Sequence, residues 1–142
     1  MLSILIGLIL SAIFLFLSGV HFYWGLGGKW GINVSIPTKE NNEKLINPKL
    51  FHCFLIAFGL LICAVFVLIK VGIISFALPH FIIKDGLSVI AGIFIIRAVG
   101  EFKYVGFFKK VKNTRFGQMD TKYYSPLCLC IGLMRILLEL LN

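Results

Sequence analysis

The fold of this chain is decided around residues 93–108, which read Ile93-Phe-Ile-Ile-Arg97-Ala-Val-Gly-Glu101-Phe-Lys-Tyr-Val-Gly-Phe-Phe108. The segment begins as an apolar run of the kind found in lipid, and it then places an arginine and a carboxylate four residues apart. On a helix that spacing stacks both side chains on one face. Because a charge inside a membrane span is costly, Arg97 and Glu101 indicate either an internal ion pair or a functional site.

The composition of the whole chain points to a membrane protein. Of the 142 residues, 59% are hydrophobic and 14% are charged, whereas soluble domains carry about 25% charged residues. The apolar residues fall in long runs that match the roughly 20 residues a helix needs to cross a bilayer. The sequence therefore predicts an all-α fold, with residues 1–142 forming one integral membrane domain, a four-helix bundle.

Four membrane spans are predicted, at about residues 2–24, 48–69, 86–108 and 125–141. The first is interpreted as a retained span, because no Lys or Arg precedes its apolar run as in a signal peptide. The dipeptide Asn47-Pro48 begins the second, since Asn is a good N-cap and Pro suits the first helical position. Asp85 is expected to cap the third span, and Ser125-Pro126 begins the fourth.

Residues 71–83 are apolar but too short to cross a bilayer alone, and Pro79 interrupts them. We expect a re-entrant or interfacial connector between the second and third spans. If this segment crossed the membrane instead, the protein would have five spans.

The distribution of basic residues predicts the orientation. Ten lysines and arginines lie in or beside the two long loops, residues 25–47 and 109–124. Only two lie on the opposite side of the membrane. The ten are Lys29, Lys39, Lys44, Lys49, Lys103, Lys109, Lys110, Lys112, Arg115 and Lys122, and the two are Lys70 and Lys84. By the positive-inside rule both loops are cytoplasmic. The protein is then expected in the cell (inner) membrane as a multi-pass protein, with both termini on the outer side.

The net charge of +8 is explained by the same rule and by anionic lipid. No basic and aromatic interleaving supports binding to nucleic acid. The bilayer and an anionic lipid or amphiphile are the expected partners, and a homo-oligomer is left open.

Polar residues gather at the predicted cytoplasmic end, and the other end is nearly bare. Polar groups converging beside aromatic residues are typical of ligand sites, and a guanidinium suits phosphate or carboxylate. We therefore expect a cytoplasmic-side pocket for an anionic lipid-like ligand or a partner helix. Its candidate residues are His21, Tyr23, Trp24, Lys29, His52, Arg97, Glu101, Asp120, Tyr124 and Ser125.

Simpler explanations stand beside this hypothesis. Arg97 with Glu101 can be a structural ion pair that joins helices, and Asp120 can be an ordinary loop or cap residue. Arg135 and Glu139 are interpreted as an arginine that snorkels to water, steadied by its neighbour. No His-x-x-x-His or Cys-x-x-Cys spacing supports a metal site, and no cofactor is expected.

Two other classes of function remain open. One is an enzyme acting on a lipid-like substrate, with His21 and Glu101 as an acid–base pair beside Arg97. The other is a small transporter, which the absence of an inverted repeat disfavours. Neither an enzymatic reaction nor a specific ligand follows from the residues alone.

Three ordered motifs carry a resemblance that covers most of the chain: His21-Phe-Tyr-Trp-Gly-Leu-Gly-Gly-Lys-Trp-Gly31, Arg97-Ala-Val-Gly-Glu-Phe-Lys-Tyr-Val-Gly-Phe-Phe-Lys109 and Phe116-Gly-Gln-Met-Asp-Thr-Lys-Tyr-Tyr-Ser-Pro-Leu-Cys128. With them the chain resembles the small bacterial four-span family catalogued as domain of unknown function 3995. Glu101 stands where an Asp is expected in many members. The resemblance implies a membrane topology and no chemistry.

Overall fold

A computed structural model describes residues 1–31, 41, 43, 50–100 and 105–141 of the 142-residue chain. Within these residues there are four long helices and no strand, so the predicted all-α fold is confirmed. A short helix and a π-helical turn run directly into the last long helix. In chain order the elements are α1 (Leu2–Gly25), α3 (Leu50–Lys70), α4 (His80–Val99), α5 (Arg115–Met119), η1 (Asp120–Tyr124) and α6 (Ser125–Leu141).

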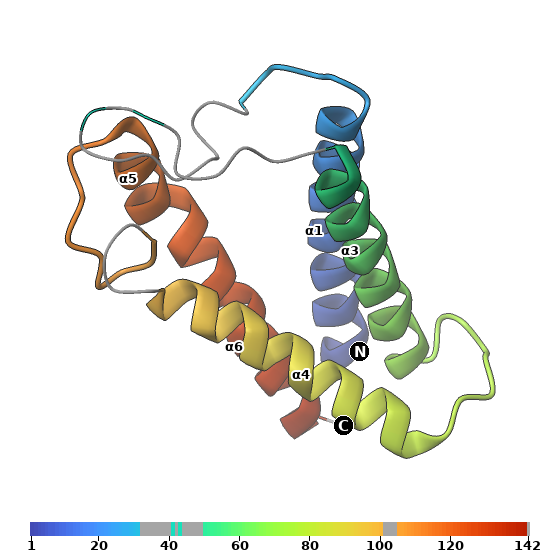
Figure 1. The fold of residues 1–142 in the computed structure, drawn as a ribbon. Coiled ribbons are helices and arrows are strands. Elements are labelled where there is room, and N and C mark those ends of the chain that lie inside the picture. The colour runs from blue at the N-terminus through green and yellow to red at the C-terminus, as the bar shows by residue number, and fades with distance from the viewer. Residues whose placement is uncertain (32–40, 42, 44–49, 101–104, 142) are drawn as a thin grey trace.

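The long helices form two pairs that meet at one end and splay apart at the other (Figure 1). In the first pair, α1 donates two buried hydrogen bonds to backbone oxygens of α3, from Ser11 to Ala64 at 3.3 Å and from Ser18 to Ala57 at 2.7 Å. In the second pair, α4 packs along α6. The shared core lies where the pairs meet and includes Leu10, Phe14, Leu60, Val67, Leu87, Ile131 and Leu138.

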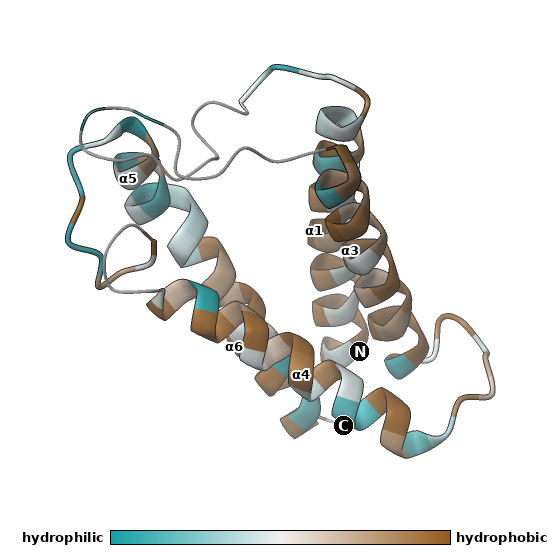
Figure 2. Cartoon of the chain, in the orientation of Figure 1, coloured by the Kyte–Doolittle hydropathy of each residue, from teal (hydrophilic) through white to brown (hydrophobic). Residues whose placement is uncertain are grey.

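Three stretches of helix are long and apolar enough to cross a membrane, namely Leu2–Gly25, Leu50–Lys70 and Arg115–Leu141. Apolar residues, coloured brown, make up most of these helices (Figure 2). The fourth long helix, α4, is not among them, because it carries three charged residues, Lys84, Asp85 and Arg97. The chain therefore has the helices of a multi-pass membrane protein.

The helix predicted over residues 86–108 is shifted toward the N-terminus. Pro79 is its N-cap, so Asp85 lies inside the helix and the prediction that Asp85 caps it is wrong. The helix ends at Val99 because Gly100 adopts a positive φ of 82°, a conformation open to glycine and unfavourable for other residues. Residues 71–74 are turns and bends, residues 75–79 have no regular secondary structure, and residues 80–83 belong to α4, so this connector does not form a fifth helix.

The helical structure that leads into α6 begins earlier than predicted. Residues 115–124 were expected to belong to a loop, but α5 and η1 make them helical. The Thr114 hydroxyl accepts a hydrogen bond from the backbone N–H of Gly117 at 2.9 Å and so starts the helix. The predicted helix start at Asn47-Pro48 lies outside the described residues.

Candidate functional site

A buried carboxylate, Asp120, is the centre of the charged residues at the splayed end. It is the first residue of η1, where the chain changes from α5 to a π-helical turn before entering α6. Such turns interrupt the regular helical hydrogen bonds and are frequent at functional sites. The Asp120 side chain is 0% exposed, so both of its oxygens need partners inside the protein.

Both Asp120 oxygens have such partners. Oδ1 accepts from Nη2 of Arg97 on α4 at 2.9 Å. Oδ2 accepts from the backbone N–H of Gly106 at 2.8 Å and lies 3.2 Å from Nζ of Lys109. We call Arg97, Lys109 and Asp120 the Asp120 cluster. It contains two cations and one carboxylate and therefore carries one excess positive charge.

Lys109 is fully occupied by this arrangement. Its side chain is 0% exposed. Besides facing Asp120, Nζ donates to the backbone oxygen of Gly106 at 3.1 Å and to the hydroxyl of Thr121. Three oxygen partners satisfy the three N–H donors of an ammonium group. Lys109 thus holds the segment before α5 against η1 and has no donor left for a ligand.

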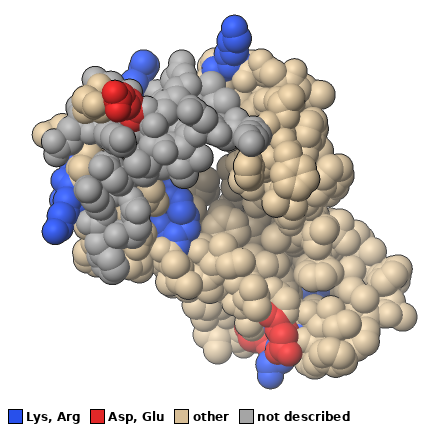
Figure 3. Space-filling view, in the orientation of Figure 1, with Lys and Arg blue, Asp and Glu red and all other residues tan. Residues whose placement is uncertain are grey.

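Arg97 differs from Lys109 because part of it is free. Its side chain is 32% exposed, and among the described residues nothing accepts a hydrogen bond from the buried Nη1. One turn earlier on α4, Phe94 contacts Phe14 of α1 with ring centroids 5.5 Å apart. Arg97 therefore lies just beyond the contact between the two helix pairs, where they begin to diverge. Figure 3 shows a hollow there, with basic side chains on its α4 side.

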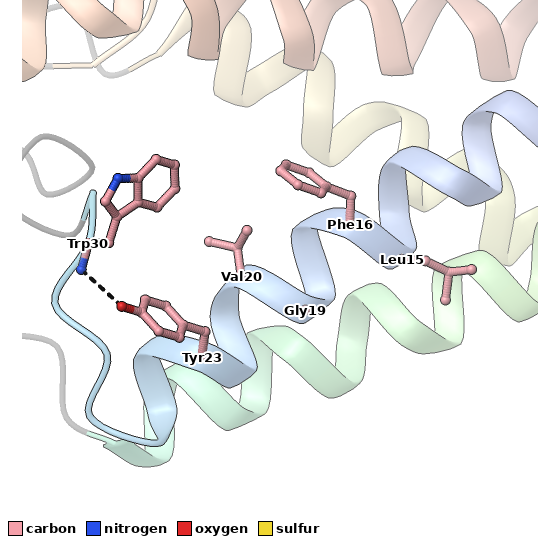
Figure 4. A pocket seen from close by; sticks show the side chains of 6 residues that line it. All are labelled: Leu15, Phe16, Gly19, Val20, Tyr23 and Trp30. Atoms are coloured by element: carbon pink, nitrogen blue, oxygen red, sulfur yellow. Dashed lines mark hydrogen bonds between the residues drawn. The ribbon is translucent and has the colours of Figure 1, made fainter.

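A cavity of about 490 Å³ lies along α1, on the arm opposite the Asp120 cluster. It is lined by Leu15, Phe16, Gly19, Val20, Tyr23 and Trp30, and we call it the α1 cavity. Figure 4 shows Phe16, Val20 and Trp30 on the side of α1 away from α3. Its volume falls within the roughly 300–1,000 Å³ typical of ligand sites.

The glycine-rich turn after α1 folds back to complete this cavity. The Trp24 indole N–H donates to the backbone oxygen of Trp30 at 2.9 Å, and the N–H of Trp30 donates to the Tyr23 hydroxyl at 3.4 Å. Gly28 lies so close to the Tyr23 ring that a Cβ there would sit 2.4 Å from it. The turn thus requires glycine for close packing, and it positions Trp30 over the cavity.

The predicted site residues fall into two groups, one on each arm of the molecule. His21, Tyr23, Trp24, Lys29 and His52 lie at the C-terminal end of α1 and the adjoining start of α3, whereas Arg97, Asp120, Tyr124 and Ser125 lie on the α4 and α6 arm (Figure 1). The expected convergence on one cavity is not observed, since of these residues only Tyr23 lines the α1 cavity. The pairs splay because their shared core is confined to the other end.

Several predicted residues have their own local partners. Nδ1 of His21 donates to the backbone oxygen of Leu17 at 2.7 Å, and its ring meets Trp24 edge-on at 5.1 Å. Lys29 and His52 are exposed. Tyr124 lies 5.9 Å from the Phe116 ring, and Ser125 is fully buried.

The predicted partner of Arg97, Glu101, lies outside the described residues. The helix that carries Arg97 ends at Val99. Among the described residues Arg97 pairs with Asp120, which the simpler sequence interpretation made a loop or cap residue. His21, which the enzyme alternative placed beside Arg97, shares no hydrogen bond with Arg97 among the described residues.

A second charged group lies at the joined end, which the sequence had suggested was nearly bare. Glu139 of α6 pairs with Lys70 of α3 and with Arg135 one turn earlier, each at 3.3 Å. Arg135 also donates toward the backbone oxygen of Lys84 and the Ser88 hydroxyl on α4. Its side chain is only 4% exposed, so the prediction that it snorkels to water is wrong. We call Lys70, Arg135 and Glu139 the Glu139 cluster.

No group of three or more metal-ligating side chains occurs in the part of the chain that the structure describes. The family comparison matches residues 14–135 to a model described as "Protein of unknown function (DUF3995)". No curated protein and no solved structure matches the chain. The matched range contains the Asp120 cluster and all residues that line the α1 cavity, and it ends at Arg135, before Glu139.

Proposed function

We propose, for a chain that belongs to the DUF3995 family of proteins of unknown function, that it binds an anionic amphiphile between its two helix pairs. The anionic group lies against Arg97, and the apolar part lies against α1. The family supplies no activity, so the argument rests on the geometry of the Asp120 cluster.

The observation that carries the proposal is that Nη1 of Arg97, a buried donor, has no acceptor among the residues that the structure describes. A buried donor without an acceptor costs about 1–3 kcal/mol, and more when it is charged. Nη2 is fixed by Asp120 at 2.9 Å, so the guanidinium plane is held in place. A guanidinium fixed on one edge presents its other donors to phosphate or carboxylate with little loss of side-chain entropy.

The charge of the cluster supports the same ligand class. Lys109 and the N–H of Gly106 partner Oδ2 of Asp120, and Arg97 partners Oδ1, so one carboxylate is shared by two cations. The excess positive charge resides on the member of the cluster that is 32% exposed. An anion bound there neutralises the cluster and satisfies the free donor.

The ligand is an amphiphile because the surroundings of the site are apolar. The helices have the composition of membrane spans, and the opposite arm offers Phe16, Val20 and Trp30 in an uncharged cavity. A small hydrophilic anion would gain no binding energy from these apolar side chains. An anion joined to an apolar chain can bind both Arg97 and the apolar cavity.

Loss of the Arg97 charge should reduce lipid binding. We expect purified protein in neutral detergent to bind phosphatidylglycerol in preference to phosphatidylcholine. Arg97→Gln should weaken the binding of phosphatidylglycerol about tenfold or more, since a hydrogen bond to a charged group contributes about 1.5–3 kcal/mol. Native mass spectrometry and lipid titration measure the affinity. In this variant Asp120 keeps Lys109 and the Gly106 N–H at Oδ2, and the glutamine amide can still donate toward Oδ1, so we expect the fold to be preserved.

Lys110→Gln is the matched control, because Lys110 lies beside Lys109, is exposed and loses the same charge. It should leave phosphatidylglycerol binding unchanged. Equal binding of phosphatidylglycerol by wild type and Arg97→Gln, or no preference over phosphatidylcholine, would refute the proposed function.

We further propose that the splayed end faces the cytoplasm, with both termini outside. The basis is the ten-to-two distribution of Lys and Arg described above. In a cysteine-free protein, single cysteines at Asn41 and Asn113 should resist an impermeant maleimide in intact cells. A cysteine at Ser75, in the connector at the opposite end, should react. Labelling at position 41 or 113, together with protection at position 75, would show that the protein has the opposite orientation in the membrane.

A further inference from the structure

The α1 cavity has the features of a site for an apolar chain. None of its six lining residues is charged. From Phe16 to Tyr23 it follows two turns of α1, about 10 Å at 1.5 Å per residue. Trp30 stands at the end near the glycine turn (Figure 4). An elongated apolar slot that ends beside an aromatic side chain fits the shape of an acyl chain.

Gly19 lines the α1 cavity, and the space beside it is open because glycine has no side chain. A Cβ built at Gly19 would meet no heavy atom within 4 Å, so close helix packing does not explain the glycine. Its backbone is helical, so no special turn conformation explains it either. Glycine inside a helix costs roughly 0.5–1 kcal/mol relative to alanine. With glycine at position 19, α1 is therefore less stable than it would be with alanine, and the space beside position 19 stays open.

Trp30 is held at the cavity by hydrogen bonds and not by packing. Its backbone N–H and C=O are bound by Tyr23 and Trp24, but Trp30 remains 75% exposed. Phe16, on the same cavity wall, is 68% exposed. Two large aromatic residues fixed around an open apolar slot provide contact area for a chain at little cost in conformational entropy.

The position of the cavity fits the anion site. Phe14 of α1 touches Phe94 of α4 where the helix pairs meet. The cavity residues follow Phe14 along α1, and Arg97 follows Phe94 along α4, so both lie just beyond the same contact. A single molecule with one charged end and one apolar chain can therefore contact both arms. The positive charge of Arg97 favours such a molecule over an uncharged helix of a second protein.

We propose that the α1 cavity binds the acyl chain of the anionic amphiphile and that Gly19 determines which chains fit. This inference rests on the proposed function, because it assigns the apolar part of the same ligand. Long chains gain affinity by burying their methylene groups against Phe16, Val20 and Trp30, at about 0.8 kcal/mol for each methylene that becomes buried. Short chains bind through the anion alone.

The test fills the cavity with a side chain. Gly19→Leu places a branched side chain in the space, and it should weaken binding of dioleoyl phosphatidylglycerol about tenfold or more, a loss equivalent to about 1.4 kcal/mol. Binding of dihexanoyl phosphatidylglycerol should not change. Gly59→Leu is the matched control, since Gly59 is also helical and exposed with nothing within 4 Å of a built Cβ, but it lies on α3 and outside the cavity. It should bind both lipids as wild type does.

Fluorescence gives an independent readout without substitution. Both tryptophans of the chain lie at this end of α1, so phosphatidylglycerol with brominated chains should quench their emission more than brominated phosphatidylcholine does. Gly19→Leu should abolish the difference.

The outcomes separate this inference from the proposed function. If wild type prefers phosphatidylglycerol and Arg97→Gln loses that preference, but Gly19→Leu behaves like Gly59→Leu, the chain site is refuted and the anion site stands. If Gly19→Leu weakens the long-chain and short-chain lipids equally, the chain site is also refuted. If Arg97→Gln has no effect while Gly19→Leu does, the cavity binds a chain and the proposed anion site is wrong.

Discussion

The two charged clusters have the same composition but different surroundings. Each joins one carboxylate to two cations, Asp120 to Arg97 and Lys109, and Glu139 to Lys70 and Arg135. In the Asp120 cluster the carboxylate and Lys109 are both 0% exposed. In the Glu139 cluster the carboxylate is 35% exposed and Lys70 is 11% exposed.

The two clusters differ in how their members are exposed and in which helices they join. The Glu139 cluster joins three helices, and its buried arginine also reaches Lys84 and Ser88 of α4. Its Nε lacks a partner too, but the side chain is only 4% exposed, so a ligand has no access to it. In the Asp120 cluster the arginine side chain is 32% exposed, although its Nη1, which has no partner among the described residues, is itself covered.

The largest expected effect comes from neutralising the fully buried carboxylate. Asp120→Asn leaves Lys109 charged, enclosed and without a counter-ion. Breaking a buried ion pair by removing one partner costs about 3–5 kcal/mol. At about 3–4 °C per kcal/mol for a chain of this size, the melting temperature in detergent should fall by about 10–20 °C. Thermal unfolding followed by circular dichroism measures it.

A double variant identifies the cause of that loss. In Asp120→Asn with Lys109→Met, the stranded lysine charge is absent, so the double variant should be more stable than Asp120→Asn alone. A double variant that is no more stable would mean that the Asp120 hydrogen bond to Gly106 dominates over the ion pair.

A smaller effect is expected at the other cluster. Glu139→Gln removes a carboxylate that already reaches water, and Arg135 keeps its contacts with Lys84 and Ser88. The cost should be about 1–3 kcal/mol, the usual penalty for a weakened buried polar group. The melting temperature should then fall by about 3–10 °C, and lipid binding should be unchanged. A loss equal to that of Asp120→Asn would contradict the distinction that we draw between the clusters.

Much of the fold follows from local sequence. The ends of α1 and α6 coincide closely with the predicted spans 2–24 and 125–141, because apolar runs of that length leave few alternatives to a helix. The family resemblance drawn from three motifs agrees with the matched model over residues 14–135. Arg97 and Asp120 were both recognised as candidates, because charges near apolar helices are rare and costly.

The partner of Arg97 could not be read from spacing. The rule that links residues four apart holds only while the helix continues, and Gly100 ends it with a φ of 82°. Its actual partner is Asp120, 23 residues further along the chain. The glycines at positions 100 and 106 were a usable signal in principle, because glycine tolerates the positive φ that both residues adopt and that ends the helix at Gly100.

The sequence by itself determined that this protein is helical, that it has the helices of a multi-pass membrane protein, and that its rare charges matter, because hydropathy and helix length are local properties of the chain. Only the tertiary structure decided which charges meet. Asp120 pairs with Arg97, and Glu139 pairs with Lys70 across helices. Such pairings depend on how separate helices pack and where they diverge. That geometry arises from contacts such as Phe14 with Phe94, between residues that are far apart in the sequence.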